Sequence, residues 1–265
     1  MDTSASTLTE LLRTDHGGVA TLTLNRPEQY NALSVALLAA LQTAIDDIGR
    51  DPRVRVVIIA GAGKAFCAGH DLKEMRAQPG HEAVADGAFS RASQLMLSIT
   101  RLPQPVIARV HGFAFAAGCQ LVAQCDLAVA SRNAQFATSG VKFGLFCNTP
   151  GVALARSVGR KQAMEMLLTG EPIDAQTALE RGLVNRVVAG EALDVEIARL
   201  TQAIIEKTPV AIASGKRTFY EQLEMGLEDA YKVATQAMVK NMSTEDATEG
   251  IDAFTAKRKP VWKGK

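Results

Sequence analysis

The sequence has four cysteines, and their spacing excludes two kinds of stabilising site. Cys67, Cys119, Cys125 and Cys147 form no C-x-x-C pair, and none belongs to a His–Cys cluster with zinc spacing. We therefore predict neither a disulfide framework nor a bound metal. Thiols that stay reduced indicate a reducing compartment.

Long apolar runs are also missing. Residues 1–15 are polar and carry acidic side chains early, so they lack the cationic start and apolar stretch of a signal peptide. No later apolar run has the roughly 20 positions that a bilayer-spanning helix needs. These features predict a cytoplasmic protein with no membrane partner.

Neither sign of charge is in excess. Lys and Arg total 29 against 28 for Asp and Glu, which gives a net charge of +1. This balance gives no electrostatic reason to expect nucleic acid as a partner, and the basic tail at 257–265 is interpreted as a solvated tail. A small-molecule partner fits better.

Two common catalytic motifs are incomplete or missing. GAGK at 61–64 lacks the G-x-x-x-x-G-K-[ST] spacing of a phosphate loop, and Ala65 occupies the hydroxyl position. No G-x-S-x-G sequence occurs, so a serine hydrolase of the common α/β type is unsupported. Nucleotide hydrolysis is likewise not expected.

What the sequence does contain is a set of predicted strands of two kinds. Residues 19–25 alternate between apolar and polar side chains, which is the period of a half-buried strand. Residues 54–61 are β-branched and almost wholly apolar, as expected of a strand covered on both faces, and 105–112 and 126–131 are similar. Helical stretches separate these strands, which predicts an α/β fold.

Helical patterns divide the chain into two regions. Ser34 is placed to cap a helix that ends near the Asp51-Pro52 pair, because proline cannot continue a helix. From about residue 197 the pattern is helical throughout. The chain has 265 residues, of which 47% are hydrophobic, and this is enough to bury one large core. We assign that core to residues 1–196 and a C-terminal helical region to residues 197–265.

Two glycine-bearing segments follow predicted strands and bring backbone amides to the mouth of the core. They read AFCAGHDLKEM at 65–75 and HGFAFAAGCQL at 111–121. In the second segment small residues lead into a helical stretch, whose first amides have no partner within the helix and can point at a negatively charged oxygen. Small residues before a helix also serve close packing, so each segment alone has a purely structural explanation.

Taken together, the two segments and their flanks resemble the crotonase family, the enoyl-CoA hydratase/isomerase superfamily. The resemblance spans nearly the whole chain and rests on GVATLTLNRPEQYNALS, AGHDLKEM, HGFAFAAGCQLVAQCDLAVAS, ARSVGRKQAMEMLLTGEPIDAQTALERGLVNRVV and AFTAKRKPVW. It implies a spiral of β-β-α units, with 197–265 as a trimerisation region. It also implies a homotrimer or a hexamer made of two trimers.

The resemblance implies an acyl-CoA thioester as the binding partner, with coenzyme A as part of the substrate and no separate cofactor. Two backbone amides of the family form an oxyanion hole, and they match His70 and Ala117. The substrate-binding positions of the family fall on the two motif segments and on RPEQYNAL, at Glu28, Tyr30, Ala68, His70, Asp71, Leu72 and Ala117. An oxyanion hole of this kind stabilises an enolate next to a thioester carbonyl.

The sequence departs from the family at the carboxylates that perform the chemistry. Hydratases of the family use two glutamates as acid and base, and these positions read Gln120 and Gly140 here. The glutamine amide does not titrate, and glycine has no side chain. A dehalogenase branch uses an aspartate at the position of Asn148, where a neutral amide is a poor nucleophile.

Few other side chains can replace those carboxylates. His70 has a suitable intrinsic pKa, although its place in the family depends on its backbone. Cys147 lies on the expected pocket wall, but most unpaired cysteines are small buried hydrophobes. We expect Asp71 to brace the loop and Glu74 to face solvent.

Two hypotheses remain from different classes of protein. The first is an enzyme that acts on an acyl-CoA through an enolate, for which classical hydratase activity is doubtful. The second is a catalytically weak or inactive acyl-CoA-binding or regulatory protein. The intact oxyanion segments favour the first, and Gln120 and Gly140 favour the second or an altered reaction.

Overall fold

The computed structural model describes residues 9–77 and 81–265. Strands form two sheets, of which the larger has the order β1-β2-β3-β5-β7-β10 and is parallel except for the β1–β2 hairpin. Its strands are β1 (Leu11–His16), β2 (Val19–Leu24), β3 (Val56–Gly61), β5 (Val106–Val110), β7 (Leu127–Ser131) and β10 (Arg186–Val188). The smaller sheet contains β4 (Ala65–Cys67), β6 (Phe113–Phe115), β8 (Gln135–Ala137) and β9 (Ile173–Asp174).

Helices follow the strands in a repeating order. Those of the α/β part are α1 (Val35–Arg50), α2 (Leu72–Arg76), α3 (His81–Arg101), α4 (Ala117–Gln124), α5 (Asn148–Ser157), α6 (Arg160–Thr169), α7 (Ala175–Glu180) and α8 (Leu193–Ile205). Short 3₁₀ turns are η1 (Pro27–Gln29), η2 (Ser139–Phe143) and η3 (Gly190–Ala192). A strand of the larger sheet, a strand of the smaller sheet and then a helix recur in β3-β4-α2, β5-β6-α4 and β7-β8-α5. The predicted α/β fold with β-β-α units is thereby confirmed.

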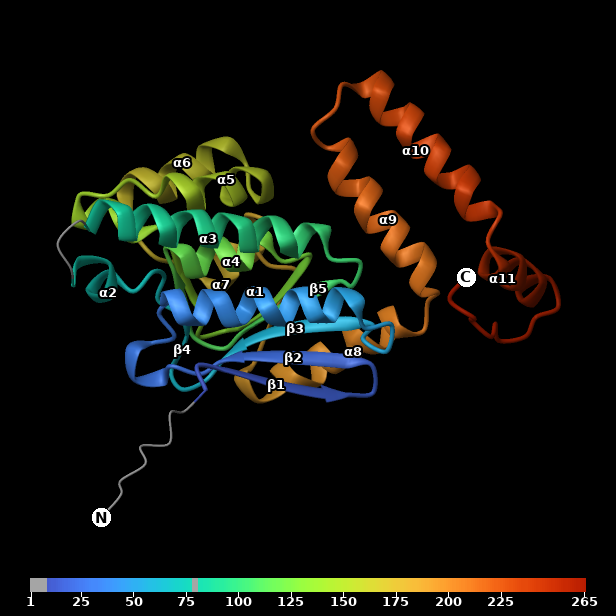
Figure 1. Cartoon of the computed structure of the whole chain (residues 1–265), viewed down its shortest axis with the longest axis horizontal. Coiled ribbons are helices and arrows are strands. Elements are labelled where there is room, and N and C mark those ends of the chain that lie inside the picture. Colours follow the sequence, from blue (N-terminus) through green and yellow to red (C-terminus); the bar gives the residue numbers. More distant parts are fainter. Residues whose placement is uncertain (1–8, 78–80) are drawn as a thin grey trace, which may run out of the picture.

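Apolar residues on the two faces of the larger sheet pack into separate clusters. On β3, Val57 and Ile59 join the main core, whereas Val56 and Ile58 pack with Leu193 and other apolar residues of the α8 side. Figure 1 shows α1 along one side of the sheet and α8 near its other side. Both faces are covered, as the unbroken apolar run predicted.

Local sequence signals explain where α1 begins and how β2 is oriented. The Ser34 hydroxyl accepts a hydrogen bond from the Leu37 N–H at 3.0 Å, so the predicted cap is present. On β2, Ala20, Leu22 and Leu24 are fully buried while the residues between them are partly exposed.

The C-terminal region consists of α9 (Pro209–Gln222), α10 (Leu227–Met242) and α11 (Glu245–Thr255). In Figure 1, α9 and α10 form an antiparallel pair that projects from the α/β part. The division predicted after residue 196 falls inside α8, whose Leu193 and Ile197 are both buried on the sheet. Trimerisation through this region stays a prediction.

A buried ion pair ties α9 to the α/β part. The Lys216 ammonium donates to Asp126 Oδ2 at 2.6 Å and to the carbonyl oxygens of Ile99 and Gln104 at 2.9 Å. The Tyr220 hydroxyl donates to the other oxygen of Asp126 at 2.8 Å. The Lys216 side chain is 7% exposed, so this charge was moved out of water during folding.

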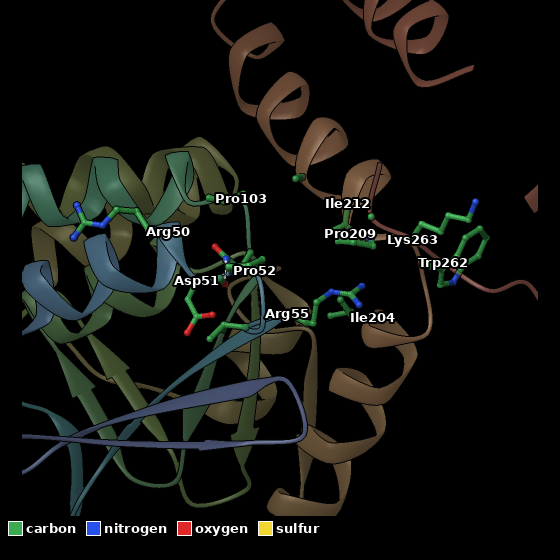
Figure 2. A pocket seen from close by; sticks show the side chains of 15 residues that line it. Arg50, Asp51, Pro52, Arg55, Pro103, Ile204, Pro209, Ile212, Trp262 and Lys263 are labelled. Carbon is green, nitrogen blue, oxygen red and sulfur yellow. Dashed lines mark hydrogen bonds between the residues drawn. The ribbon is translucent and has the colours of Figure 1, made fainter. Parts of the chain in front are cut away.

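A cavity of about 620 Å³ lies where the ends of α1 and α8, the start of α9 and the C-terminal segment meet. Figure 2 shows Arg55, Ile204 and Trp262 among its lining side chains. This cavity shares no lining residue with the motif segments at 65–75 and 111–121. The cavity is therefore separate from the candidate site that these segments form.

Candidate functional site

Two glycines let the motif segments touch each other. A Cβ atom on Gly69, whose φ is +101°, would lie 2.9 Å from the Ala116 Cβ and 3.2 Å from the Ala117 backbone nitrogen. A Cβ atom on Gly118 would lie 2.2 Å from the Cys67 carbonyl oxygen. Any larger residue at either position would push the 65–75 segment away from the start of α4.

His70 directly follows Gly69, and Ala117 is one of the residues against which Gly69 packs. The neighbouring N–H groups already have backbone acceptors. The Ala116 N–H donates to the Ala137 oxygen at 2.8 Å, and the Asp71 N–H donates to the Leu33 oxygen at 3.2 Å. Within residues 9–77 and 81–265, the N–H groups of His70 and Ala117 donate to no protein acceptor. Two such donors beside each other can bind an oxygen that carries negative charge.

The turn into α4 holds an unusual backbone conformation. Ala116 has φ +48° and ψ −116°, which residues other than glycine rarely adopt. The Gln120 N–H closes the first helical turn onto the Ala116 oxygen at 3.0 Å. The Ala117 amide is thus held at the first position of a helix, where no intrahelical acceptor exists for it.

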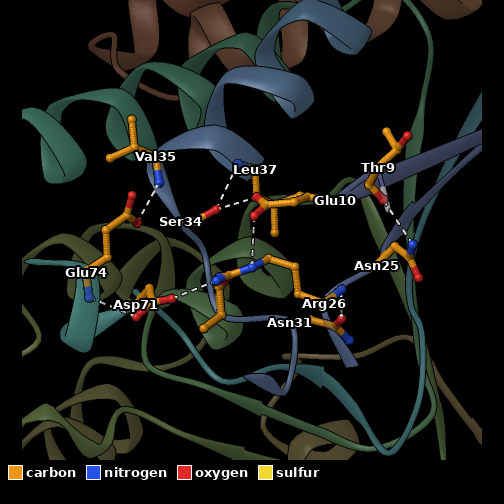
Figure 3. Close-up of polar contacts among 11 residues, drawn as sticks. Thr9, Glu10, Asn25, Arg26, Asn31, Ser34, Val35, Leu37, Asp71 and Glu74 are labelled. Atoms are coloured by element: carbon orange, nitrogen blue, oxygen red, sulfur yellow. Dashed lines mark hydrogen bonds and ion pairs between the residues drawn. The ribbon is translucent and has the colours of Figure 1, made fainter. Parts of the chain in front are cut away.

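A network of ionic and hydrogen bonds braces the loop that carries His70 (Figure 3). Asp71 accepts from the Glu74 N–H at 3.1 Å and pairs with the Arg26 guanidinium at 2.9 Å. Burial raises the pKa of Asp71, but these hydrogen bonds and the Arg26 charge outweigh it, so the pKa lies below its usual value. The bracing role predicted for Asp71 is confirmed.

Glu74 does not face solvent as predicted, and Arg26 was not predicted at all. The Glu74 carboxylate accepts a hydrogen bond from the Val35 N–H at 3.0 Å. Val35 is the first residue of α1, so its N–H has no acceptor within the helix, and Glu74 supplies one. Arg26 also donates to the Ala32 oxygen at 2.5 Å and pairs with Glu10 at 3.2 Å. The sequence pattern could not reveal these partners, because they come from different elements.

Gln120 and Gly140 have different surroundings. Gln120 is 4% exposed, and its Oε1 atom has no hydrogen-bond partner among the described residues. Gly140 is covered by its own loop, because a Cβ atom there would lie 2.4 Å from the Leu145 oxygen and 2.7 Å from Cys147 Sγ. A glutamate at position 140 therefore requires the 140–147 segment to move.

Cys147 and Asn148 lie at the start of α5 and have little capacity for nucleophilic attack. Burial raises the pKa of the Cys147 thiol, which accepts a hydrogen bond from the Gly140 N–H at 3.2 Å. Burial also raises the pKa of Cys119 to about 12. The Asn148 side chain is exposed.

The imidazole of His70 is held in a largely apolar environment. Its ring meets Phe89 edge to face with centroids 4.9 Å apart, and neither ring nitrogen has a partner in the described part of the chain. Burial lowers the pKa of His70 to about 4. The imidazole is therefore neutral near pH 7, and it is a weak proton acceptor.

Of the other predicted substrate-binding residues, Ala68 and Tyr30 are joined by a hydrogen bond. The Ala68 N–H donates to the Tyr30 oxygen at 3.0 Å, and the Tyr30 ring lies 5.5 Å from that of Phe113. Tyr30 is 50% exposed and Leu72 is 43% exposed. Glu28 lies on η1 with an exposed side chain.

Two other kinds of site are missing from the described residues. No group of three or more His, Cys, Asp or Glu side chains is arranged to hold a metal ion there. None of the helices in that part of the chain combines the length and the apolarity needed to cross a membrane.

The fold and the paired motif segments define a crotonase-like protein, and comparison with known proteins agrees. The Enoyl-CoA hydratase/isomerase family model matches residues 14–265, so the chain belongs to that family. A crystal structure of enoyl-CoA hydratase from Mycobacterium smegmatis is 56% identical with a TM-score of 0.93, covering 96% of this chain and 98% of that one.

A particular set of relatives carries a more specific name. The human enoyl-CoA hydratase domain-containing protein 3 has a crystal structure that is 47% identical with a TM-score of 0.92, covering 96% of this chain and all of that one. The Xenopus laevis protein of the same name is 48% identical over 95% of this chain and 85% of its own length.

The predicted cytoplasmic location is contradicted by these relatives. The proteins from Xenopus laevis, mouse and human are all named as mitochondrial. The prediction was based on reduced thiols and on the polar sequence at residues 1–15, and neither feature distinguishes one reducing compartment from another.

Proposed function

We propose that this protein binds an acyl-CoA thioester and stabilises its enolate with the backbone N–H groups of His70 and Ala117. Coenzyme A is part of the substrate, and no separate cofactor is needed. The main support is that neither N–H group has an acceptor among the described residues, while Gly69, next to His70, packs against Ala116 and Ala117. Preorganised donors of this kind stabilise charge that develops on the thioester oxygen.

We propose further that the reaction is not classical hydration. Gln120 cannot act as an acid or base, and the closed loop over Gly140 leaves no room for a second carboxylate. His70 directly follows Gly69, is half-buried and is neutral near pH 7, so it offers a weak proton acceptor close to the amides. An enolate route with slow proton transfer fits this set of groups better than addition of water.

A second candidate function is non-catalytic binding of acyl-CoA. The observation that favours it is the exchange of both carboxylates for groups that do not titrate, at Gln120 and Gly140. Such a protein would keep the amide pair for binding alone. The two candidates differ in whether the bound thioester loses its α-proton.

One experiment separates these candidates. The protein is incubated with butyryl-CoA and crotonyl-CoA in deuterated water, and α-exchange and hydration are followed by mass spectrometry and NMR. The enolate-forming enzyme is expected to exchange the α-proton without hydrating crotonyl-CoA. Binding without exchange would support the second candidate, and absence of binding would refute both.

We also propose a homotrimer or a hexamer made of two trimers. Large apolar side chains on α9, α10 and α11 are exposed in a single chain, including Phe219, Leu227, Tyr231, Met238 and Phe254. Burying such side chains against another copy removes apolar surface from water. Light scattering should give three or six times the chain mass, and a monomer would contradict the proposal.

A further inference from the structure

The cavity between the α/β part and the C-terminal region is not used by the proposed function. Its volume of about 620 Å³ is typical of small-molecule sites, and its lining residues all lie outside the segments at 65–75 and 111–121. Apolar side chains from α8, from α9 and from the C-terminal segment line it, among them Ile204, Pro209 and Trp262. The cavity can therefore hold a ligand of its own.

Two lining side chains are fixed to consecutive residues at the end of α8. Arg55 donates through a terminal nitrogen to the Lys207 oxygen at 2.6 Å. The Trp262 ring N–H donates to the Glu206 oxygen at 2.7 Å. Because the two acceptors are neighbours in the chain, a guanidinium and an indole are held at the same end of α8. In Figure 2 the Arg55 side chain extends toward the start of α9, where Pro209 lies.

Arg55 is the one lining cation without a carboxylate at ion-pair distance in the described part of the chain. The guanidinium of Arg50 pairs with Asp47 at 2.8 Å. The ammonium of Lys263 pairs with Glu245 at 3.2 Å. Burial lowers the pKa of Arg55, because its charge has lost part of its contact with water.

Two acidic groups near Arg55 are already occupied. Asp51 lines the cavity, but its carboxylate pairs with Arg53 at 2.8 Å. Asp246 attracts Arg55 from a greater distance, and its oxygens accept hydrogen bonds from the backbone N–H groups of 263–264 at 2.6 and 3.0 Å. The half-buried Arg55 charge is thus left for an anion to neutralise.

We propose that this cavity binds a small monocarboxylic acid with an apolar chain or ring. One guanidinium matches one carboxylate, and the remaining N–H donors of Arg55 can bind its oxygens. The apolar lining removes the body of the ligand from water, and a carboxylate alone would leave most of the 620 Å³ empty. Such a ligand contacts the α/β part through Arg55 and the C-terminal region through Trp262.

Trp262 is the single tryptophan of the chain, so its fluorescence reports on this cavity. The wild-type protein is titrated with hexanoate, hexanamide and inorganic phosphate, and both fluorescence and calorimetry are recorded. Hexanamide keeps the shape of hexanoate without its charge. We expect hexanoate to bind about tenfold more tightly than hexanamide, as one hydrogen-bonded ion pair implies. Phosphate has no apolar body and should bind more weakly than hexanoate.

A pair of variants attributes the preference for the acid to Arg55. Arg55→Gln removes the charge, so hexanoate and hexanamide should bind within about twofold of each other. Arg132→Gln is the matched control, because it removes the same charge from an exposed arginine outside the cavity. It should keep the tenfold preference. Urea unfolding checks that both variants are folded.

Several results would overturn the proposed acid site. They are no change in fluorescence and no heat on adding hexanoate, equal binding of hexanoate and hexanamide, equal binding of hexanoate and phosphate, or a preference that survives in folded Arg55→Gln. The comparison of hexanoate with hexanamide uses the wild-type protein, so it decides the matter even if Arg55→Gln is unfolded. Thioester binding by the His70 and Ala117 amides stands or falls separately, because neither residue lines the cavity.

Discussion

Replacing Gly69 with alanine should disrupt the amide pair while leaving most of the fold in place. The new Cβ atom would lie 2.9 Å from the Ala116 Cβ and 3.2 Å from the Ala117 nitrogen, on a backbone with φ +101°. The backbone conformation costs about 1–3 kcal/mol, and crowding adds about 1–3 kcal/mol. Together they amount to about 2–6 kcal/mol, which is less than the stability of most domains, so the variant is expected to fold.

The functional loss should exceed the structural one. If the 65–75 segment moves away from α4, the His70 amide no longer shares an oxygen with the Ala117 amide. Loss of one such donor typically lowers a rate by about 10²–10³. The α-exchange rate of butyryl-CoA in deuterated water measures this loss, and urea unfolding measures the stability.

Gly17→Ala provides the matched control. Gly17 also has positive φ, at +56°, but a Cβ atom there would have no neighbour within 4 Å. This variant should lose stability through its backbone alone and keep the wild-type exchange rate. A folded Gly69→Ala protein that exchanges as fast as the wild type would show that the Gly69 contact does not hold the two amides in place.

Three further predictions concern other parts of the structure. Lys216→Met should lower the free energy of unfolding by about 3–5 kcal/mol in urea titrations, because it leaves Asp126 charged and buried without its cation. Gln120→Glu should fold, whereas Gly140→Glu should be destabilised by its clash with the closed loop and give no hydratase activity with crotonyl-CoA. The low pKa of His70, about 4, should make the wild type lose about 2 kcal/mol more stability than His70→Gln between pH 7.5 and pH 5.

The sign of the His70 effect follows from the proton count. Below the usual pKa of 6.5 the unfolded chain binds a proton that folded His70 binds only near pH 4, so stability is lost as the pH falls through this window. Equal pH dependence of the two proteins would contradict the buried, neutral imidazole.

The Lys216→Met prediction has a matched control on the surface of the protein. Lys232 is 60% exposed and pairs with Glu228 on the surface of α10, so Lys232→Met should leave the unfolding curve unchanged. An effect of Lys216→Met no larger than this would show that the buried pair does not anchor α9. Active, stable Gly140→Glu protein would show that the 140–147 loop opens easily.

Local patterns in the sequence were sufficient to predict much of the fold. The alternation on β2, the apolar run of β3 and the Ser34 cap depend on residues close in the chain, and all three are present. The resemblance to the family added the order of the β-β-α units.

Features built from distant residues could not be predicted in this way. The Glu74 carboxylate meets Val35 across 39 positions, and Lys216 meets Asp126 across 90. The closure of the loop over Gly140 depends on the backbone position of Leu145. Neither the amino-acid composition nor the hydrophobic periodicity of the sequence indicates that position.

The proposed stabilisation of an enolate by the His70 and Ala117 amides is tested most directly with acetoacetyl-CoA, because its enolate has its own ultraviolet absorbance. Titrating the bound ligand with pH gives the pKa of its α-proton. Two hydrogen bonds to the charged oxygen should lower that pKa by about two units or more relative to free ligand, and Gly69→Ala should abolish most of the shift. A bound ligand whose pKa is unchanged or raised would show that the two amides do not stabilise the enolate.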